Sequence, residues 1–320
     1  MLALPAAKPK IAISACLLGA EVRYNGGHKE SRLCSRTLTE YFEFAPVCPE
    51  VAIGLGIPRE PIRLVGDPEH PEAIGTVNPA INVTQPLAAY GEQMAGELDD
   101  ICGYIFMQQS PSCGLERVKV YHANGAPVSG GGRGIYAQAF CAQHPDLPVE
   151  EAGRLNDPVL RENFITRVFA YSAWQQVLAD GLSRRALTEF HSRYKYQLMA
   201  HNPLQYKALG KLLGNMAHSD PAELGPRYFS QLMAALKKCA TRGTHCNVLL
   251  HISGYLKQVL SAEDKQEMVH VIGQYRQGIV PLVVPLTLLK HHFRQHPDPY
   301  IAQQVYLQPH PENLSLRNAI

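Results

Sequence analysis

The segment Lys10-Ile11-Ala12-Ile13-Ser14-Ala15-Cys16-Leu17-Leu18-Gly19 carries the pattern that decides the fold of the first half of the chain. Residues 10–15 form a short apolar run typical of a buried strand, and the run leads directly to a cysteine and a glycine. A second run covers residues 42–47 and ends in a similar way, at Cys48-Pro49-Glu50. The two segments therefore predict two buried strands that each end at a cysteine.

A third apolar run, residues 104–107, precedes a polar loop that contains Cys113. Between the second and third runs, residues 84–100 have the apolar spacing of an amphipathic helix, with Leu87, Tyr90, Met94 and Leu98 on one face. Strands separated by helices predict an α/β domain with a mostly parallel sheet.

The second half of the chain contains sequence signals for the starts of helices. Proline, glycine and acidic residues cluster at 145–156, and beyond them an N-cap residue precedes proline three times, at Asp157-Pro158, Asn202-Pro203 and Asp220-Pro221. We therefore expect an all-α domain of roughly six helices. A length of 320 residues also favours two domains, which we place at residues 1–150 and 157–320.

Composition excludes several classes of protein and shows a charge asymmetry. The chain is 46% hydrophobic and 18% charged, which excludes a disordered chain, and its 25 glycines follow no repeat, which excludes collagen. Its net charge of +2 hides two unlike halves. Residues 1–160 hold 12 Lys+Arg against 18 Asp+Glu, a net of −6, and residues 161–320 hold 18 against 10, a net of +8. The basic half predicts a polyanionic partner, and a chance imbalance between two solvated surfaces is the alternative.

The sequence also bears on the cellular compartment. Residues 1–5 lack the basic stretch of a signal peptide, and the longest apolar run, near residues 279–289, contains Pro281 and Pro285 and is too short to span a membrane. We therefore expect a cytoplasmic protein, in which the eight cysteines are reduced.

Three cysteines share one local context. Cys16, Cys48 and Cys113 each follow an apolar run and precede a turn. Because ligands collect beyond the carboxyl ends of parallel strands, these three thiols can converge. Three thiolates suit a soft metal or an iron–sulfur cluster with one iron left open. Buried structural thiols are the alternative, since the sequence has no C-x-x-C pair.

The other cysteines fit a shared site less well. Cys102 opens an apolar run and is expected in the core, whereas Cys34 and Cys141 have polar neighbours in sequence. Cys239 and Cys246 flank an expected helix break together with His245. These three side chains are a small set for a zinc site, so structural roles are the alternative.

The sequence motifs around the three cysteines resemble those of the thiouracil desulfidase family. The resemblance spans residues 8–150, and the adjoining helical half is similar to a YbgA-type domain in residues 190–201. Together they resemble the desulfidases that act on 4-thiouridine in transfer RNA. The motifs are Ile13-Ser14-Ala15-Cys16-Leu17-Leu18-Gly19, Arg23-Tyr24-Asn25-Gly26-Gly27, Val47-Cys48-Pro49-Glu50 with Gly54-Leu55 and Pro58-Arg59, and Ser110-Pro111-Ser112-Cys113-Gly114.

The resemblance implies a [4Fe-4S] cluster held by Cys16, Cys48 and Cys113, whose fourth iron takes the sulfur of a thiocarbonyl. Exchange of C=S for C=O by water needs no net electron transfer, and an iron bound to the sulfur would polarise the ring carbon. Glu50 and Ser110 match the positions to which the family assigns acid/base and positioning roles. Glu50 is then the expected general base, and Ser110 a donor to the ring nitrogen or a proton carrier. Without the resemblance, both are ordinary turn residues.

Two glycine-containing loops can each be interpreted either as part of a binding site or as a plain connection. Arg23-Tyr24-Asn25 before two glycines is either a ribose- or phosphate-binding loop or a plain turn. Residues 129–134, Ser-Gly-Gly-Gly-Arg-Gly, lack the lysine of a P-loop and the glycine spacing of a dinucleotide site. They are either a mobile loop beside the substrate or a linker.

The basic half offers a surface for RNA. A modified base in folded RNA must leave its stack to reach a buried site, and phosphate contacts then supply affinity. Tyr194, Tyr196 and Tyr206 lie among the cations and can stack on bases, although Tyr194 also fits the apolar stripe of the core. The candidate RNA-binding residues are Arg184, Arg185, Arg193, Lys195, Lys207 and Lys211.

The hypothesis is therefore an iron–sulfur-dependent desulfidase that converts 4-thiouridine in transfer RNA to uridine and releases sulfide. One alternative is a desulfidase of free thiolated bases whose helical half serves dimerisation. The other is an RNA-binding redox sensor whose cluster is only a switch. The sequence leaves the oligomeric state open.

Overall fold

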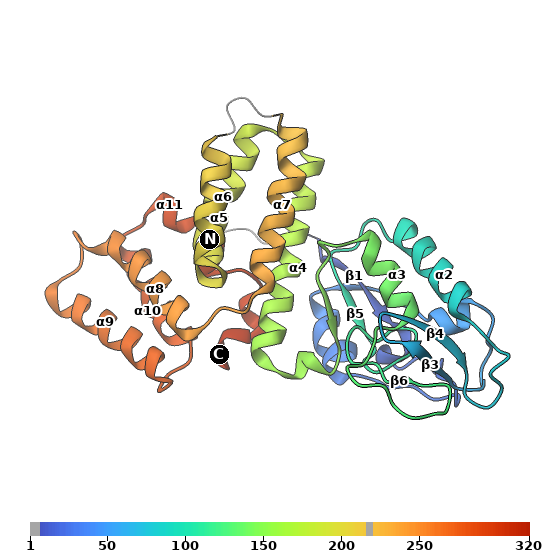
Figure 1. The fold of residues 1–320 in the computed structure, drawn as a ribbon. Coiled ribbons are helices and arrows are strands. Elements are labelled where there is room, and N and C mark those ends of the chain that lie inside the picture. Colours follow the sequence, from blue (N-terminus) through green and yellow to red (C-terminus); the bar gives the residue numbers. More distant parts are fainter. Residues whose placement is uncertain (1–6, 216–219) are drawn as a thin grey trace. The chain divides into compact units, whose positions relative to one another are not determined.

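The structure, a computed structural model, describes residues 7–215 and 220–320. They divide between Asn156 and Asp157 into two compact units, each with its own core (Figure 1). Residues 1–6 lie outside the described part, and they include residues 1–5, on which the expected lack of a signal peptide rests. In the described part, no helix combines the length and apolar character needed to cross a membrane.

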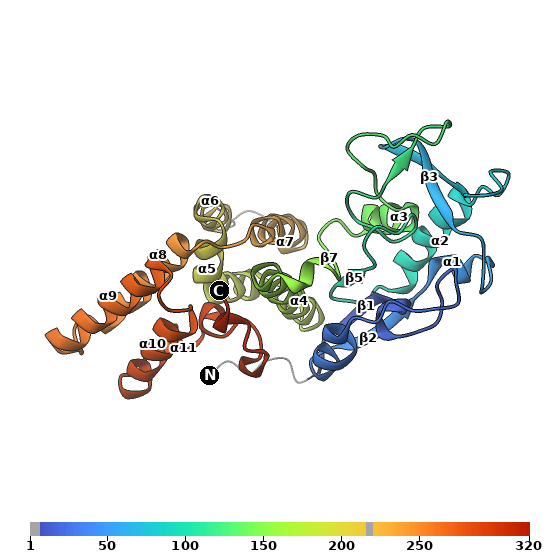
Figure 2. The ribbon, with the colours of Figure 1, turned by 90° about the horizontal axis from the view of Figure 1, so that it is seen from below.

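The first unit is built on a fully parallel four-stranded sheet in the order β2-β1-β5-β7 (Figure 2). Ile11, Ala12 and Ile13 of the central strand β1 are completely buried, because both faces of the sheet are covered. The predicted α/β fold with a mostly parallel sheet is confirmed. Its strands are β1 (Lys10–Ser14), β2 (Glu43–Val47), β5 (Tyr104–Phe106) and β7 (Val149–Glu151).

Two helices of this unit pack tightly against each other. They are α2 (Thr84–Glu97), at the position predicted, and α3 (Ile135–Gln143). A Cβ atom at Gly91 of α2 would lie 2.8 Å from both the Ala139 Cβ and the Tyr136 carbonyl oxygen of α3. Glycine is therefore required where the two helices touch.

A second sheet, in the order β4-β3-β6, was missed by the sequence analysis. β3 (Ile62–Asp67) and β4 (His70–Gly75) form an antiparallel hairpin, and the short β6 (Val120–Tyr121) runs parallel to β3. Few of their side chains are buried, Leu64 and Ala73 among them. An apolar pattern this sparse gives little strand signal.

The second unit is helical, as predicted, but it has more helices than expected. Asp157, Asn202 and Asp220 each cap a helix that begins with proline, as their sequence context indicated. The sequence Thr241-Arg242-Gly243 forms the start of α8, whose N-cap is Thr241 and whose first turn includes Gly243. The α-helices of the described part are α4 (Pro158–Ala179), α5 (Arg184–His201), α6 (Pro203–Gly214), α7 (Pro221–Lys237), α8 (Arg242–Ser253), α9 (Ala262–Gln277), α10 (Val283–Gln295) and α11 (Pro299–Ala302).

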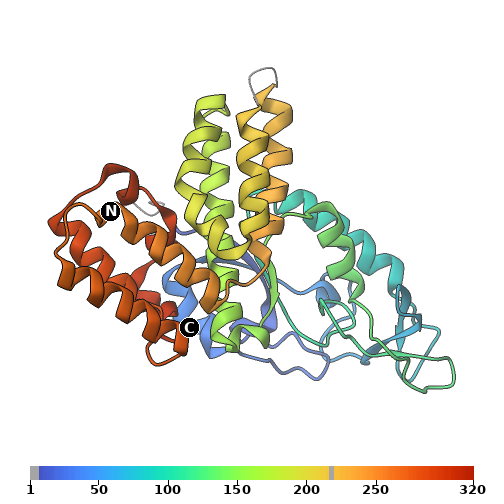
Figure 3. The ribbon, with the colours of Figure 1, turned by 60° about the vertical axis from the view of Figure 1, so that its left-hand side comes forward.

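The helical unit has two apolar clusters. Trp174, Phe190, Tyr228 and Phe229 belong to the first, which lies among α4, α5, α6 and α7 (Figure 3). The second lies chiefly among α8, α9 and α10. α5 contributes to both, since Phe190 belongs to the first cluster and Ala200 to the second.

A buried ion pair ties α4 to the C-terminal segment. Arg317 Nε donates to Glu162 Oε1 at 3.2 Å, and His310 Nε2 lies 3.6 Å from the same oxygen. Burial alone would raise the pKa of Glu162, but His310 and Arg317 outweigh it and hold this pKa well below its usual value. The carboxylate is therefore charged and balances the buried guanidinium.

Candidate functional site

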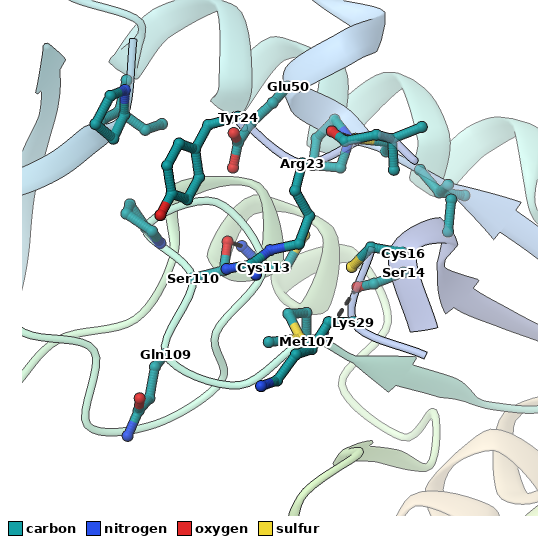
Figure 4. Close-up of a pocket in the computed structure, with 18 of the residues that line it drawn as sticks. Ser14, Cys16, Arg23, Tyr24, Lys29, Glu50, Met107, Gln109, Ser110 and Cys113 are labelled. Atoms are coloured by element: carbon teal, nitrogen blue, oxygen red, sulfur yellow. Dashed lines mark hydrogen bonds between the residues drawn. The ribbon is translucent and has the colours of Figure 1, made fainter. Parts of the chain in front are cut away.

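The three cysteines expected to converge line one cavity of about 420 Å³ (Figure 4). Cys16 lies in the 3-10 turn that follows β1, Cys48 is the N-cap of α1 (Pro49–Ala52) directly after β2, and Cys113 lies in the loop after β5. β1 pairs in parallel with both β2 and β5, so their carboxyl ends meet at the same edge of the sheet. Topology therefore brings together three thiols that are far apart in sequence.

The environment of the thiols disfavours their charged forms. Burial, and then the nearby Cys48, raises the pKa of Cys16 to about 11. Burial also raises the pKa of Cys48, and it raises the pKa of Cys113 well above the usual value, where Glu50, Cys48 and Cys16 add to the rise. Three neighbouring thiolates in this cavity need a positively charged partner, which a metal centre supplies.

Ser110 shapes the turn that presents Cys113. Its Oγ accepts hydrogen bonds from the backbone N–H groups of Ser112 and Cys113, at 3.2 and 3.1 Å, and its carbonyl accepts from Gly114 N–H at 2.8 Å. Because the hydroxyl oxygen acts as the acceptor, the hydroxyl proton is left to donate into the cavity. Ser110 lies on the cavity wall, as Figure 4 shows.

The later part of the glycine-rich loop, residues 131–134, packs against the chain. A Cβ at Gly131 would lie 2.8 Å from Arg117 Cα, and one at Gly134 only 2.5 Å from the Ser112 carbonyl carbon. Gly134 N–H also donates to the Gly114 carbonyl. The end of this loop therefore supports the turn that carries Cys113.

Glu50 is held from both sides by residues that the sequence analysis did not assign. Arg59 donates to its Oε2 through Nη2 at 2.7 Å and Nε at 2.9 Å, and the Ser112 hydroxyl donates to its Oε1 at 2.8 Å. Arg59 is itself fixed by the carbonyls of Val22 and Gly56. This geometry fixes the carboxylate at the cavity wall, and Oε1 keeps a lone pair for a further donor.

The loop from Arg23 to Asn25 places two side chains at the cavity. Arg23 lies over the Tyr24 ring, 5.5 Å from its centroid, and both residues line the cavity with Lys29. The backbone carbonyl of Tyr24 accepts from Arg59 N–H, which connects this loop to the partner of Glu50. The loop therefore belongs to the site in space, and its binding of ribose or phosphate stays a prediction.

The remaining cysteines lie outside this cavity. Cys34, expected in polar surroundings, is completely buried because the turn at Leu33–Thr37 directs it inward. Cys102 is buried as expected. In the other unit, Cys246 joins the second apolar cluster and His245 Nδ1 shares a hydrogen bond with the Tyr306 hydroxyl.

No group of three or more His, Cys, Asp or Glu side chains in the described part can hold one metal ion. The zinc site considered for Cys239, His245 and Cys246 is therefore absent there. Cys16, Cys48 and Cys113 are likewise not arranged around a single ion. Such a result is compatible with a cluster, whose thiolate ligands bind different iron atoms and so lie further apart.

The candidate RNA-binding cations occupy different parts of α5 and α6. Lys195 and Lys207 line a shared groove of about 440 Å³ with Tyr206 and Tyr300. Lys195 Nζ lies 5.4 Å from the centroid of the Tyr196 ring and 5.6 Å from that of Tyr300. The other four candidates lie outside this groove, at Arg184, Arg185, Arg193 and Lys211.

Exposure separates these other candidates. Arg184, Arg185 and Lys211 are exposed, and Arg185 pairs with Glu189 at 2.7 Å. Arg193 is half-buried, with a buried Nε that has no hydrogen-bond partner among the described residues. Tyr194 and Tyr196 are buried, so of the three tyrosines considered for stacking only Tyr206 remains accessible.

Comparison with known proteins finds separate matches in the two compact units of the chain. Residues 11–152 match the family model for 2-thiouracil desulfurase. The chain is 30% identical over 136 residues to the uncharacterized protein YbbK of Bacillus subtilis (strain 168), across 38% of this chain and 84% of YbbK. The chain belongs to the 2-thiouracil desulfurase family. The cysteine motifs quoted above therefore lie in the family's own domain.

The helical unit has relatives of its own. Residues 195–311 match a model described as a protein of unknown function, DUF1722. The chain is 29% identical over 159 residues to the uncharacterized protein YbgA of Escherichia coli (strain K12), across 49% of this chain and 94% of YbgA. The resemblance to a 2-thiouracil desulfurase fused to a YbgA-type domain is confirmed.

One solved structure is similar to part of the chain. It is the [4Fe-4S]-dependent thiouracil desulfidase TudS, with 28% sequence identity and a TM-score of 0.36. The match covers 47% of this chain and 95% of TudS.

Proposed function

We propose that this member of the 2-thiouracil desulfurase family removes sulfur from 4-thiouridine in transfer RNA and leaves uridine and sulfide. The observation that carries the proposal is the cavity in which Cys16, Cys48 and Cys113 meet Glu50 and Ser110. It combines soft ligands for a sulfur-binding metal centre with a carboxylate and a hydroxyl for proton transfer.

The donor set fits a [4Fe-4S] cluster. Cys16, Cys48 and Cys113 come from three separate strand ends and supply thiolates only, which iron–sulfur clusters prefer. When bound, the cluster would supply an iron atom without a protein ligand, which can take up the sulfur of a thiocarbonyl. Metal binding also displaces the thiol protons that burial otherwise retains.

The remaining steps belong to the side chains around the cavity. Glu50, oriented by Arg59 and Ser112, accepts a proton from the water that attacks the ring carbon. Ser110 directs its hydroxyl proton into the cavity and donates to the ring of the substrate. Together they hold the water and the ring in the orientation that the exchange of sulfur for oxygen requires.

The helical unit supplies the proposed RNA contacts. Lys195 and Lys207 share one groove with two tyrosine rings, a combination that suits a phosphate beside an unstacked base. Burial, and then the charge of Lys195, lowers the pKa of His191 in this groove to about 4. His191 is therefore neutral at physiological pH, and the charge of the groove comes from its lysines.

Neutralising Lys207 and Lys211 together tests the RNA part of the proposal. Both side chains are exposed on α6, so we expect K207Q/K211Q to fold normally and to bind thiolated transfer RNA about 10-fold more weakly. The slope of log affinity against log salt should fall by about two, one for each lost phosphate contact. Filter binding at several salt concentrations measures both effects.

A matched double variant provides the control. K257Q/K265Q removes the same charge from another part of the helical unit and should bind like the wild type. Turnover of free 4-thiouracil by K207Q/K211Q should equal that of the wild type. Unchanged RNA binding by K207Q/K211Q would remove these lysines from the footprint, and a protein that turns over only the free base would establish the free-base alternative.

A further inference from the structure

A second cavity adjoins the cysteine pocket. It has a volume of about 430 Å³ and lies over the three-stranded sheet β4-β3-β6. Ile62, Gln109 and Pro111 line both cavities, so the two are neighbours that meet at these residues. In Figure 4 the side chain of Gln109 points away from Cys16 and Cys113. A ligand whose reacting end lies at the cysteines can therefore extend past Gln109 into the second cavity.

Strand register places two cations and an aromatic ring in this second cavity. Leu64 of β3 pairs with Val120 of β6, and both side chains are completely buried beneath the sheet. Side chains alternate along strands, so Arg63 and Tyr121 lie on the opposite face, and both line the cavity together with Lys119, which directly precedes β6.

The guanidinium of Arg63 lacks a full set of partners. Its carbon lies 5.8 Å from the centroid of the Tyr121 ring, and its Nε is buried without a hydrogen-bond partner among the described residues. A buried N–H group without a hydrogen-bond partner costs free energy, and this one can donate to an anion in the cavity.

Charge makes this cavity unlike the rest of its unit. The first half of the chain has a net charge of −6, yet the described residues that line the second cavity include Arg63 and Lys119 and no aspartate or glutamate. Lys119 is exposed and Arg63 is half-buried, so a ligand can reach both. Two cations, a donor hydroxyl at Thr76 and a ring at Tyr121 are groups that bind a phosphate and the sugar or base attached to it.

The cysteine pocket has cations of its own, and they differ in position from Arg63 and Lys119. Arg23 points towards Ser110 and Cys113 in Figure 4, and its charge therefore faces the reacting centre. Lys29 also lines that pocket and is the competing candidate for a phosphate. Arg63 and Lys119 differ from both because they line the second cavity only.

We propose that the second cavity binds the phosphate of the thiolated nucleotide whose base enters the cysteine pocket. The ligand class is a pyrimidine nucleoside monophosphate, free or as one phosphodiester of an RNA strand. The inference rests on the proposed function, since it assumes that the base of such a nucleotide occupies the pocket. It adds a specificity site on the α/β unit that distinguishes a nucleotide from a free base.

Equilibrium binding to the full-length protein, with its cluster reconstituted anaerobically, tests this subsite. The probes are uridine, uridine 5′-monophosphate and uridine 3′-monophosphate, measured by calorimetry. We expect one of the two monophosphates to bind the wild type at least about 10-fold more tightly than uridine. R63Q and K119Q should each reduce this gain at least about 3-fold, and R63Q/K119Q should abolish it. Their affinity for uridine should stay unchanged.

Two single variants serve as controls. R36Q removes an exposed cation that lines neither cavity and should keep the full gain, and K29Q should keep it as well. Three results would each overturn the subsite: both monophosphates bind no better than uridine, K119Q keeps the full gain, or K29Q loses it. Because Lys119 is exposed, K119Q decides the matter even where R63Q fails to fold. The binding data do not depend on turnover, so a phosphate gain in a protein that leaves thiolated RNA intact would reject the proposed function and retain the subsite.

Discussion

Replacing Cys16, Cys48 or Cys113 by serine is expected to abolish both the iron–sulfur absorbance and desulfidation. Each thiol comes from a different strand end, so no neighbouring cysteine in the cavity can replace it. A serine hydroxyl is a hard and weakly acidic ligand that does not replace a thiolate on iron. We expect activity to fall more than about 100-fold, beyond the loss that residues outside the ligand set typically cause. Iron content and visible absorbance measure the loss of the cluster, and sulfide release measures the loss of activity.

The matched control is Cys141→Ser in α3, a cysteine of the same unit that does not line the cavity. It should retain iron, colour and activity. Retained colour in all three ligand variants would contradict the ligand assignment. Loss of colour in Cys141→Ser as well would show that the serine substitutions act through folding, which circular dichroism of each variant checks independently.

Glu50→Gln is expected to lower kcat on thiolated RNA by about 10²- to 10⁴-fold, the usual contribution of a general base. The amide keeps the shape of the carboxylate and can still accept from Arg59 or Ser112, so the cluster should remain bound. It cannot accept a proton from water. Single-turnover kinetics should show the loss in the chemical step, with RNA affinity unchanged.

Glu21→Gln, the same change at an exposed site outside the cavity, is the control and should have wild-type kinetics. The result also separates a hydrolytic enzyme from a redox sensor. A sensor has no attacking water to deprotonate, so it should tolerate Glu50→Gln. Wild-type turnover by this variant would remove Glu50 from the mechanism.

The strand ends that build the site could be predicted because an apolar run leads to each cysteine, although β1 is buried almost throughout and the edge strand β2 buries only Val47. Residues 10–15 and 42–47 are short apolar runs next to cysteines, and β1 and β2 form there. The parallel pairing of these strands then places Cys16 and Cys48 at one edge. By contrast, β3 buries only Leu64 and β4 buries only alternate residues, so neither strand gave a continuous apolar run to detect.

The partners of Glu50 could not be predicted from local patterns. Ser112 reaches Glu50 across 62 residues, and Arg59 is placed by the carbonyls of Val22 and Gly56. These contacts depend on how loops from different strand ends pack together, which no periodicity in the sequence records. Tyr196 shows the opposite error, since a polar sequence context suggested a surface ring and the packing of α5 buries it.

Nucleoside analysis of thiolated transfer RNA is the most direct test of the central claim. Transfer RNA that contains 4-thiouridine is incubated with the anaerobically reconstituted full-length protein, digested and analysed by mass spectrometry, and the sulfide released is titrated. We expect 4-thiouridine to disappear, uridine to appear in its place and one sulfide to be released for each base converted. Intact 4-thiouridine in the presence of the bound cluster would contradict the central claim.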